Sequence, residues 1–206
     1  LLPAGRTEIG LFGAARLGLS SDVELQAHPL WFFIAPHFGA KVHLVSGDSW
    51  AVSSRHSLSY PSPLLGLLSR EGTGGVLPLE TDVPHIINLT QDVLATLALR
   101  EDQRVTVRAG VRLAVSSGDS TLPTIDVPVV YPRTAAWHEG FSAEAGISWS
   151  GRVYCALFGG VSVDLFWLPA GEDSGDSWHY ALEATPHLTW RITESWALMG
   201  GAKLVQ

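Results

Sequence analysis

The sequence is short of cysteine, charge and long apolar runs, and each shortage excludes a class of protein. Cys155 is the only cysteine, so an internal disulfide is excluded. No stretch approaches the roughly 18 consecutive apolar residues that indicate a transmembrane helix. The 13 basic residues are outnumbered by 20 acidic ones and form no basic cluster, which argues against nucleic acid as a partner.

Charged residues make up only 16% of the 206 residues, where about 25% is usual for a soluble domain. Lys41 and Lys203 are the only lysines, and the mean hydropathy is positive at +0.20. We expect residues 1–206 to form one domain, with little of its surface solvated like that of a soluble protein. Residues 1–5 lack the features of a signal peptide, so for an exported protein we expect a mature or trimmed chain.

The clearest positive feature is the alternation of apolar and polar side chains in residues 104–115. Val105 to Val115 supply an apolar face at every second position, and the opposite face carries three arginines, at 104, 108 and 112. Side chains of a strand alternate between the two faces of a sheet. Globular strands usually span about 5–6 residues, but a tilted strand needs roughly 9–11 to cross a bilayer. The length therefore favours a transmembrane β-barrel.

The same alternation recurs and predicts about ten strands, near 7–19, 23–34, 37–45, 49–58, 85–100, 104–116, 138–149, 153–167, 178–191 and 195–205. A soluble sandwich or a lipocalin-like barrel also alternates, with its apolar face inward. Composition favours the membrane alternative, because the polar faces are mostly small residues with sparse charges. Tryptophans end several strands on the apolar face, where an interfacial aromatic girdle lies; these are Trp149, Trp167, Trp178, Trp190 and Trp196.

The connections between the expected strands are of two kinds. Five read as three-residue turns, at 20–22, 46–48, 101–103, 150–152 and 192–194, and three are long, at 59–84, 117–137 and 169–177. Short turns on one rim and long loops on the other are typical of outer-membrane barrels, with the short side periplasmic. Residues 60–68 read as a short amphipathic helix, which could constrict a pore, bind a partner at the rim, or pack against Trp31, Phe32 and Phe33.

Segments 17–25 and 190–198 resemble the strand-turn-strand hairpins of Gram-negative outer-membrane β-barrel proteins. The resemblance implies an even-stranded antiparallel barrel in the bacterial outer membrane, either a porin-like passive channel for small solutes or a structural barrel. Two alternatives stay open, a membrane anchor of a cell-envelope complex that binds through residues 59–84, and a lipid-processing enzyme. Ten strands would leave both termini outside, so we expect a trimmed barrel of roughly twelve strands, or one miscounted connection.

The polar face supplies the candidate site. The turn at 101–103 predicts Asp92 opposite Arg112 and Thr96 opposite Arg108, and the turn at 192–194 predicts Glu183 opposite Lys203. Such pairs stabilise neighbouring strands by roughly 0.2–1 kcal/mol. In a narrow lumen they would act as struts together with Arg16 and Glu24, the interpretation we prefer; in a wide one the arginines would favour anions. The residues expected to line the lumen are Arg104, Arg108, Arg112, Asp92, Glu144, Asp164, Glu183 and Lys203.

The sequence gives weaker support for a catalytic site or a metal site than for a membrane barrel. The eight histidines show no HxH or HExxH spacing, so no metal site and no cofactor are predicted. Ser57 beside His56, and Ser177 near Asp176 and His179, have the chemistry of an activated nucleophile. Adjacent strand residues point apart, however, and there is no GxSxG turn. The sequence therefore predicts no catalytic residue and no enzyme, and it places Cys155 on the apolar face of a strand as a small hydrophobe.

Overall fold

The computed structural model describes the chain except for residues 11–13, 30, 34, 73–81, 119–139 and 170–177. The described residues form an all-β protein with one short α-helix and one 3-10 helix. In chain order the elements are β1 Thr7–Glu8, β2 Ala15–Gly18, β3 Val23–Ala27, η1 Trp31–Phe33, β4 His37–Ser46, β5 Trp50–Ser59, α1 Ser62–Leu68, β6 Ile86–Arg100, β7 Gln103–Ser116, β8 Phe141–Tyr154, β9 Leu157–Pro169, β10 Trp178–Arg191, β11 Ala197–Gly201 and β12 Leu204–Val205.

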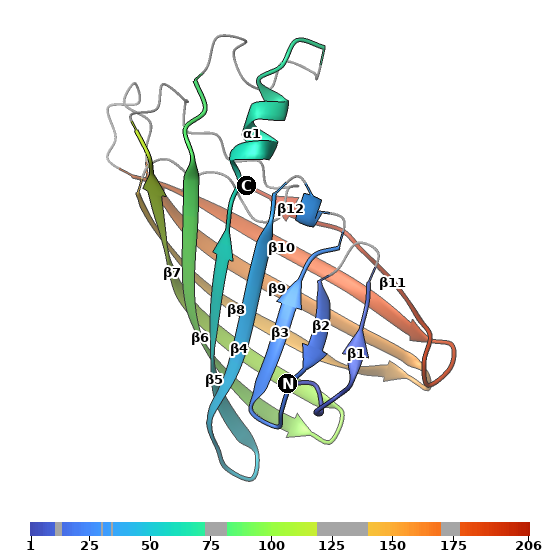
Figure 1. Cartoon of the computed structure of the whole chain (residues 1–206). Coiled ribbons are helices and arrows are strands. Elements are labelled where there is room, and N and C mark those ends of the chain that lie inside the picture. The colour runs from blue at the N-terminus through green and yellow to red at the C-terminus, as the bar shows by residue number, and fades with distance from the viewer. Residues whose placement is uncertain (11–13, 30, 34, 73–81, 119–139, 170–177) are drawn as a thin grey trace.

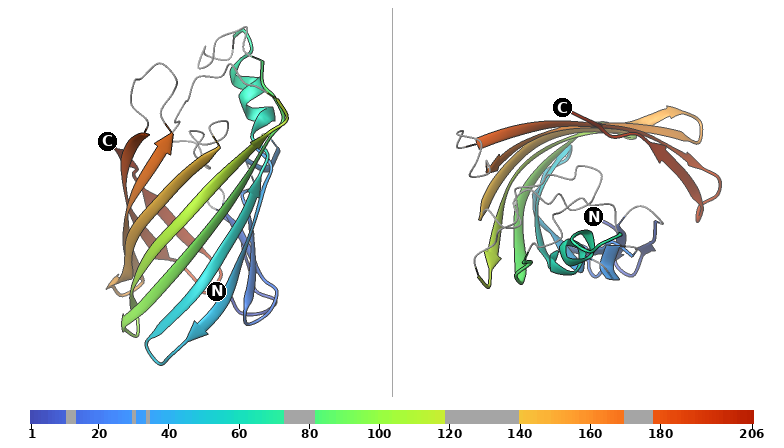
Figure 2. Two further views of the ribbon diagram at one scale, coloured as in Figure 1. Left: turned by 90° about the vertical axis from the view of Figure 1, so that its left-hand side faces the viewer. Right: turned by 90° about the horizontal axis from the view of Figure 1, so that it is seen from above.

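The twelve strands form one antiparallel sheet in which each strand pairs with its neighbour in sequence, from β1 to β11, while β12 also pairs with β10. The sheet curls into a deep trough (Figures 1 and 2). It is not closed: β1 forms one edge, and β11 and β12, which both pair with β10, form the other. The expected all-β antiparallel architecture is therefore confirmed, but the expected closed barrel is not formed. Among the described residues no helix is long and apolar enough to cross a membrane.

The structure agrees with the strands expected at 37–45, 49–58, 85–100, 104–116 and 178–191, whereas those expected at 138–149 and 153–167 are displaced by up to five residues and those at the two ends of the chain are not formed as expected. The expected strands 85–100, 104–116 and 178–191 match β6, β7 and β10 to within one residue at each end. The expected strand 7–19 instead contains two short strands, β1 and β2, which pair with each other. The strand expected at 23–34 ends at Ala27, and the one at 195–205 is divided into β11 and β12.

The observed turns differ from the expected ones in length or position, and two of these differences bear on the site. Strands β6 and β7 are joined by Glu101 and Asp102, with a register irregularity between Ala98 and Arg100. Strands β8 and β9 meet at residues 155–156, and 150–152 lie within β8. Cys155 has a φ of 40° in this turn and is exposed. Its expected place on the apolar face of a strand is therefore wrong.

The helix expected at 60–68 is confirmed as α1, which lies at the end of the sheet where β5 ends and β6 begins (Figure 1). Leu64 and Leu65 pack in a buried cluster with Ala35 and Ile86. The Ser62 hydroxyl donates to the carbonyl of Pro84 at 2.7 Å and accepts from the Ile86 amide at 2.8 Å. Helix α1 is thus fixed to the start of β6. Residues 73–81 of the expected long loop lie outside the described residues.

Burial on the sheet is the reverse of that in a water-soluble protein. One face, which we call the outer face, exposes its apolar side chains, for example Val107 at 51% and Ile147 at 52%. The other, which we call the inner face, buries its acidic residues, with Asp92 at 0% and Glu144 at 2% exposure. Soluble proteins seldom bury acidic residues fully unless they are paired, and they rarely expose extended apolar surface. The inner face is therefore where the chemistry of this fold is concentrated.

Candidate functional site

The strand register aligns inner-face residues of six neighbouring strands into one row, which we call the charged row. Each member lies directly opposite the next across a strand pair. Its members, from β3 to β8, are Glu24, Lys41, Arg55, Asp92, Gly110 and Glu144. Two of the expected lumen residues, Arg108 and Arg112, lie on the same face and are ion-paired with Glu144 of the row, and a third, Asp164, is ion-paired with Arg108.

Asp92 is held between a cation and a glycine. Arg55 is its direct partner across β5 and β6 and donates from Nε at 2.6 Å and from Nη2 at 2.5 Å to Asp92 Oδ2. On the other side lies Gly110, where an added Cβ would overlap Asp92 Oδ1. The absence of a side chain at residue 110 therefore makes the space in which a fully buried carboxylate lies against the sheet.

Glu144 is surrounded by three guanidinium groups. Arg112 Nη2 donates to Glu144 Oε2, while Arg108 Nη1 and Arg55 Nη2 lie 3.4 and 3.8 Å from Oε1. Arg55 and Glu144 are three strands apart, about 14 Å in a flat sheet. Their contact means that the sheet curves toward its inner face. The Glu144 side chain is 1% exposed.

The ion pairs continue on both sides of this centre. Arg108 Nη2 donates to Asp164 Oδ1 at 2.7 Å, and a Cβ added at Gly146 would overlap this carboxylate. On β3, Glu24 accepts from Arg16 at 2.8 and 2.9 Å. On β10, Glu183 Oε2 lies 3.3 Å from Lys203 Nζ. The pairs thus form three groups on the inner face, one on β1 to β3, one from β5 to β9, and one between β10 and the segment after β11.

The expected partners were partly wrong, by a shift of two residues. Asp92 lies opposite Gly110 and not Arg112, and Arg108 lies opposite Leu94 and not Thr96. Glu183 lies opposite Val205, although Lys203 still reaches it. Arg104 is exposed at the turn end of β7 and belongs to no ion pair between described residues. The structure therefore brings together seven of the eight expected lumen residues in pairs, and leaves Arg104 apart.

Sequence reasoning missed Arg55, which connects Asp92 to Glu144. The signal in the sequence was present but obscured, because β5 reads Ser53, Ser54, Arg55, His56, Ser57 with polar residues on both faces. A strand with one apolar face would have indicated which of these side chains point inward. Lys41, which precedes Arg55 in the charged row, was likewise not assigned a role.

The arrangement is suited to cross-linking the sheet. The central cluster contains three arginines and three carboxylates, so its formal charge is balanced. A buried carboxylate with several charge-assisted hydrogen bonds is stable only while its partners remain. Among the described residues no group of three or more histidine, cysteine or acidic side chains is arranged to hold a metal ion.

Large aromatic residues lie at both ends of the outer face. Trp167 and Tyr180 are cross-strand partners near the long connections, and Trp190 lies opposite Leu157 near the short turns. Trp149 and the 74% exposed Trp196 lie at the short-turn end as well. Trp178 is the first residue of β10, and its side chain lies outside the described part of the structure.

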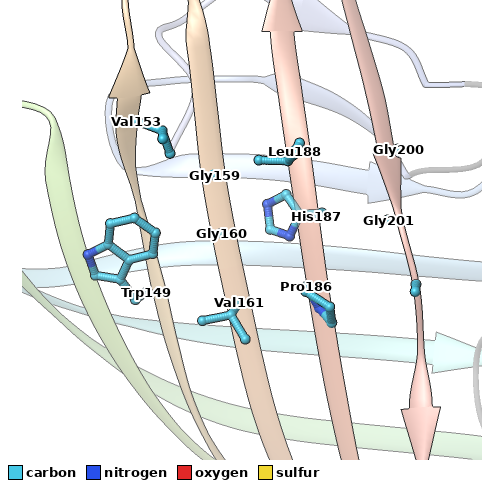
Figure 3. Close-up of a pocket in the computed structure, with 11 residues that line it drawn as sticks. Trp149, Val153, Gly159, Gly160, Val161, Pro186, His187, Leu188, Gly200 and Gly201 are labelled. Atoms are coloured by element: carbon cyan, nitrogen blue, oxygen red, sulfur yellow. The ribbon is translucent and has the colours of Figure 1, made fainter.

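A hollow of about 480 Å³ opens on the outer face across β8 to β11 (Figure 3). Gly159 and Gly200 form part of its floor, and Trp149, Val161 and Leu188 stand around it. Its lining is mostly apolar, so it suits a hydrocarbon chain, and His187 is the one ionisable side chain among the residues that line it.

Comparison with known proteins assigns no family to this arrangement. No family model matches the chain, and neither does any curated protein or any solved structure.

Proposed function

We propose that the chain is an integral β-barrel protein of the bacterial outer membrane, with a structural role and an interior braced by the charged row. The observation that carries this proposal is the reversed burial of the sheet, with an exposed apolar outer face and a buried, ion-paired inner face. A lipid-facing barrel surface is apolar, and its interior is polar. The open sheet exposes apolar side chains along its outer face, whereas soluble monomers rarely expose extended apolar patches.

The spacing of the aromatic residues fits a bilayer. Tyr180 and Trp190 lie ten residues apart on the outer face of β10. At about 3.3 Å per residue this is roughly 33 Å along the strand, or about 25 Å along the membrane normal for a strand tilted by about 40°. The apolar band of an outer-membrane barrel is about 25 Å tall and is bordered by aromatic girdles.

Insertion into a membrane also requires that the sheet edges be paired. The bilayer core offers no water to the backbone groups of an edge strand, and each unsatisfied group costs several kcal/mol. We therefore expect the trough to close in the membrane, with both β1 and β11 hydrogen-bonded on their free sides. The curvature that brings Arg55 to Glu144 is already in the direction needed for closure.

The balanced charge of the interior favours a structural barrel over an open channel. The three central arginines each contact a carboxylate, so little positive charge is left for a passing anion. A porin-like channel is the second candidate, supported by Arg104, which stands apart from the ion pairs between described residues.

The first test is electrophoretic mobility of the detergent-folded protein, boiled and unboiled, followed by conductance in a planar bilayer. We expect heat-modifiable mobility, because a closed barrel resists unfolding by detergent, and we expect no steady conductance. Heat-modifiable protein with steady conductance would support the channel instead. Protein that is monodisperse without detergent would contradict the membrane assignment.

A substitution on the outer face gives an independent test. Val111 is 44% exposed on the outer face of β7. In a soluble protein Val111→Arg would change stability little, but near the bilayer midplane it should destabilise folding by about 2 kcal/mol. Folding into vesicles measured by urea titration checks this. Arg112→Val makes the opposite change at the neighbouring inner position, and it should also lower the stability of the folded protein because it removes the ion pair with Glu144. If Val111→Arg were as stable as the wild type, membrane insertion would be contradicted.

A further inference from the structure

The short-turn end of the inner face carries three arginines that lie apart from the charged row. Arg104 on β7, Arg152 on β8 and Arg191 on β10 are all exposed at the end of the sheet that is lowest in Figure 1. The strand registers place all three on the inner face, because each lies an even number of positions along its strand from an ion-paired inner-face residue. These arginines therefore do not brace the centre of the sheet.

Two of the three guanidinium groups lie against one aromatic ring. Arg191 Cζ is 4.5 Å and Arg152 Cζ is 5.5 Å from the centroid of the Phe158 ring. Phe158 is on β9, and the two arginines come from β10 and β8, the neighbours of β9 in the sheet. A guanidinium group over an aromatic face is held there by the ring electrons and keeps N–H donors at its edge for a further acceptor. The ring thus keeps two cations close together, where they repel each other.

Little acidic charge compensates these cations. Among the described residues Arg104 and Arg191 form no ion pair, and Arg152 has one, with Asp102 at 3.3 Å. The side chains of that pair are 52% and 35% exposed, and exposed pairs are weak and readily screened by other ions. The central cluster differs, because each of its arginines contacts a buried carboxylate. The short-turn end therefore carries positive charge that an anionic ligand would neutralise.

The other acidic residues of the adjacent turns leave this charge in place. Glu101 lies between β6 and β7, and Glu194 lies between β10 and β11. Both are exposed, and within the part of the chain that the structure describes neither forms an ion pair. The stacked guanidinium groups thus remain open to a ligand from solution.

We propose that Arg152, Phe158 and Arg191 form a binding site for a terminal phosphate group. Such a group carries close to two negative charges and three acceptor oxygens, so it can accept hydrogen bonds from both guanidinium groups at once. A carboxylate has two oxygens and one charge, and it would leave one of the two cations without a partner. The phosphate belongs either to a small phosphate ester in solution or to a lipid with a terminal phosphate at the same rim.

This site is additional to the structural role proposed above and does not depend on it. The three side chains meet at the end of the sheet whether or not the outer face contacts lipid. The ligand can reach them from water, because the Arg152 side chain is 52% exposed and Arg191 is exposed as well. Arg104 adds positive charge from β7, which should increase the rate of association more than the affinity.

The closing experiment titrates inorganic phosphate, and separately acetate, into the full chain folded in a phosphate-free detergent, with binding followed by calorimetry. We expect saturable binding of phosphate, at least about tenfold tighter than that of acetate. Arg152→Gln and Arg191→Gln should each raise the Kd for phosphate at least about tenfold, because each removes charge-assisted hydrogen bonds. Arg70→Gln is the matched control: it removes the same charge beyond α1, at the opposite end of the sheet, and should leave the Kd unchanged.

Three further variants separate recognition from general attraction of anions. Phe158→Leu keeps every charge but removes the ring, and it should raise the Kd about threefold to tenfold. Asp102→Asn frees Arg152 from its carboxylate and should lower the Kd about two- to threefold. Arg191→Lys keeps the charge but not the planar fork, so its Kd should fall between those of wild type and Arg191→Gln. The urea midpoint of each variant, followed by tryptophan fluorescence, checks that the protein is folded.

Vesicles distinguish the two sources of the phosphate. The protein is folded in phosphatidylcholine vesicles with and without phosphatidic acid, extracted in detergent, and examined by native mass spectrometry. Phosphatidic acid retained by the wild type and lost in Arg191→Gln would identify the lipid. Binding of inorganic phosphate without retained lipid would identify a soluble phosphate ester.

Three results would overturn the site. Folded protein could bind neither inorganic phosphate nor phosphatidic acid. Arg70→Gln could weaken binding as much as Arg191→Gln, which would indicate general electrostatic attraction. Acetate could bind as tightly as phosphate, which would contradict recognition by two guanidinium groups. None of these results bears on the membrane assignment, which the heat-modifiable mobility tests separately.

Discussion

Replacing Glu144 by alanine is expected to lower the free energy of unfolding by about 4 kcal/mol. The substitution leaves the Arg55, Arg108 and Arg112 guanidinium groups without the carboxylate that they share. Removing one partner from a buried ion pair typically costs about 3–5 kcal/mol, because the remaining charge stays desolvated. Urea unfolding in vesicles, followed by tryptophan fluorescence, measures the change.

An exposed ion pair is the control for this effect. Arg152 and Asp102 lie 3.3 Å apart with side chains 52% and 35% exposed. Such surface pairs contribute about 0–1 kcal/mol, so Asp102→Ala should change stability by less than about 0.5 kcal/mol. Equal effects of Glu144→Ala and Asp102→Ala would show that the inner face is hydrated. If Glu144→Ala were stable and increased anion conductance, the channel would replace the structural barrel as the better proposal.

The long central strands were predictable because they carry the strongest pattern. In β6, β7 and β10 the alternation continues for 14 or 15 residues. An assignment to any structure other than a strand would therefore conflict with the hydrophobic pattern at many positions. Strands β1 and β2 contain two and four residues, which is too short for alternation to separate them. The sequence therefore predicted one long strand where a small hairpin lies.

The register of neighbouring strands was less predictable than the face of the sheet on which each side chain lies. A shift of two residues between paired strands keeps every side chain on the same face, so the hydrophobic pattern cannot detect it. The β6–β7 pair shows this error: the expected three-residue turn is a two-residue turn with an irregularity beside it, and Asp92 lies opposite Gly110. The members of the inner-face cluster were thus mostly predicted, but several of their partners were not.

The omission of Arg55 from the sequence interpretation has a physical cause. Strand β5 has polar residues on both faces, so Arg55 could not be assigned to a side. Only the pairing of β5 with β4 and β6 separates the two faces, with Arg55 inward against Asp92 and His56 outward against Gln91. Where alternation fails, the neighbouring strands determine which face a residue occupies.

A valine at residue 110 is expected to destabilise the fold by about 4 kcal/mol, although the position is on a regular strand that otherwise favours β-branched residues. The first atom of the new side chain would overlap Asp92 Oδ1 and lie 3.1 Å from the Gln91 carbonyl oxygen. Overpacking costs about 1–3 kcal/mol, and displacing Asp92 from Arg55 adds the cost of a separated buried pair. Urea unfolding in vesicles again measures the change.

Two further glycines give this prediction its controls. A Cβ at Gly200 meets nothing within 4 Å, so Gly200→Val should be nearly neutral, whereas Gly146→Val should repeat the effect through overlap with Asp164. The combined Gly110→Val and Asp92→Ala substitutions should cost less than the sum of the two alone, because each removes the same contact. Strict additivity, or equal losses at residues 110 and 200, would mean that the carboxylate does not lie over Gly110, and the charged row would then lose its central link.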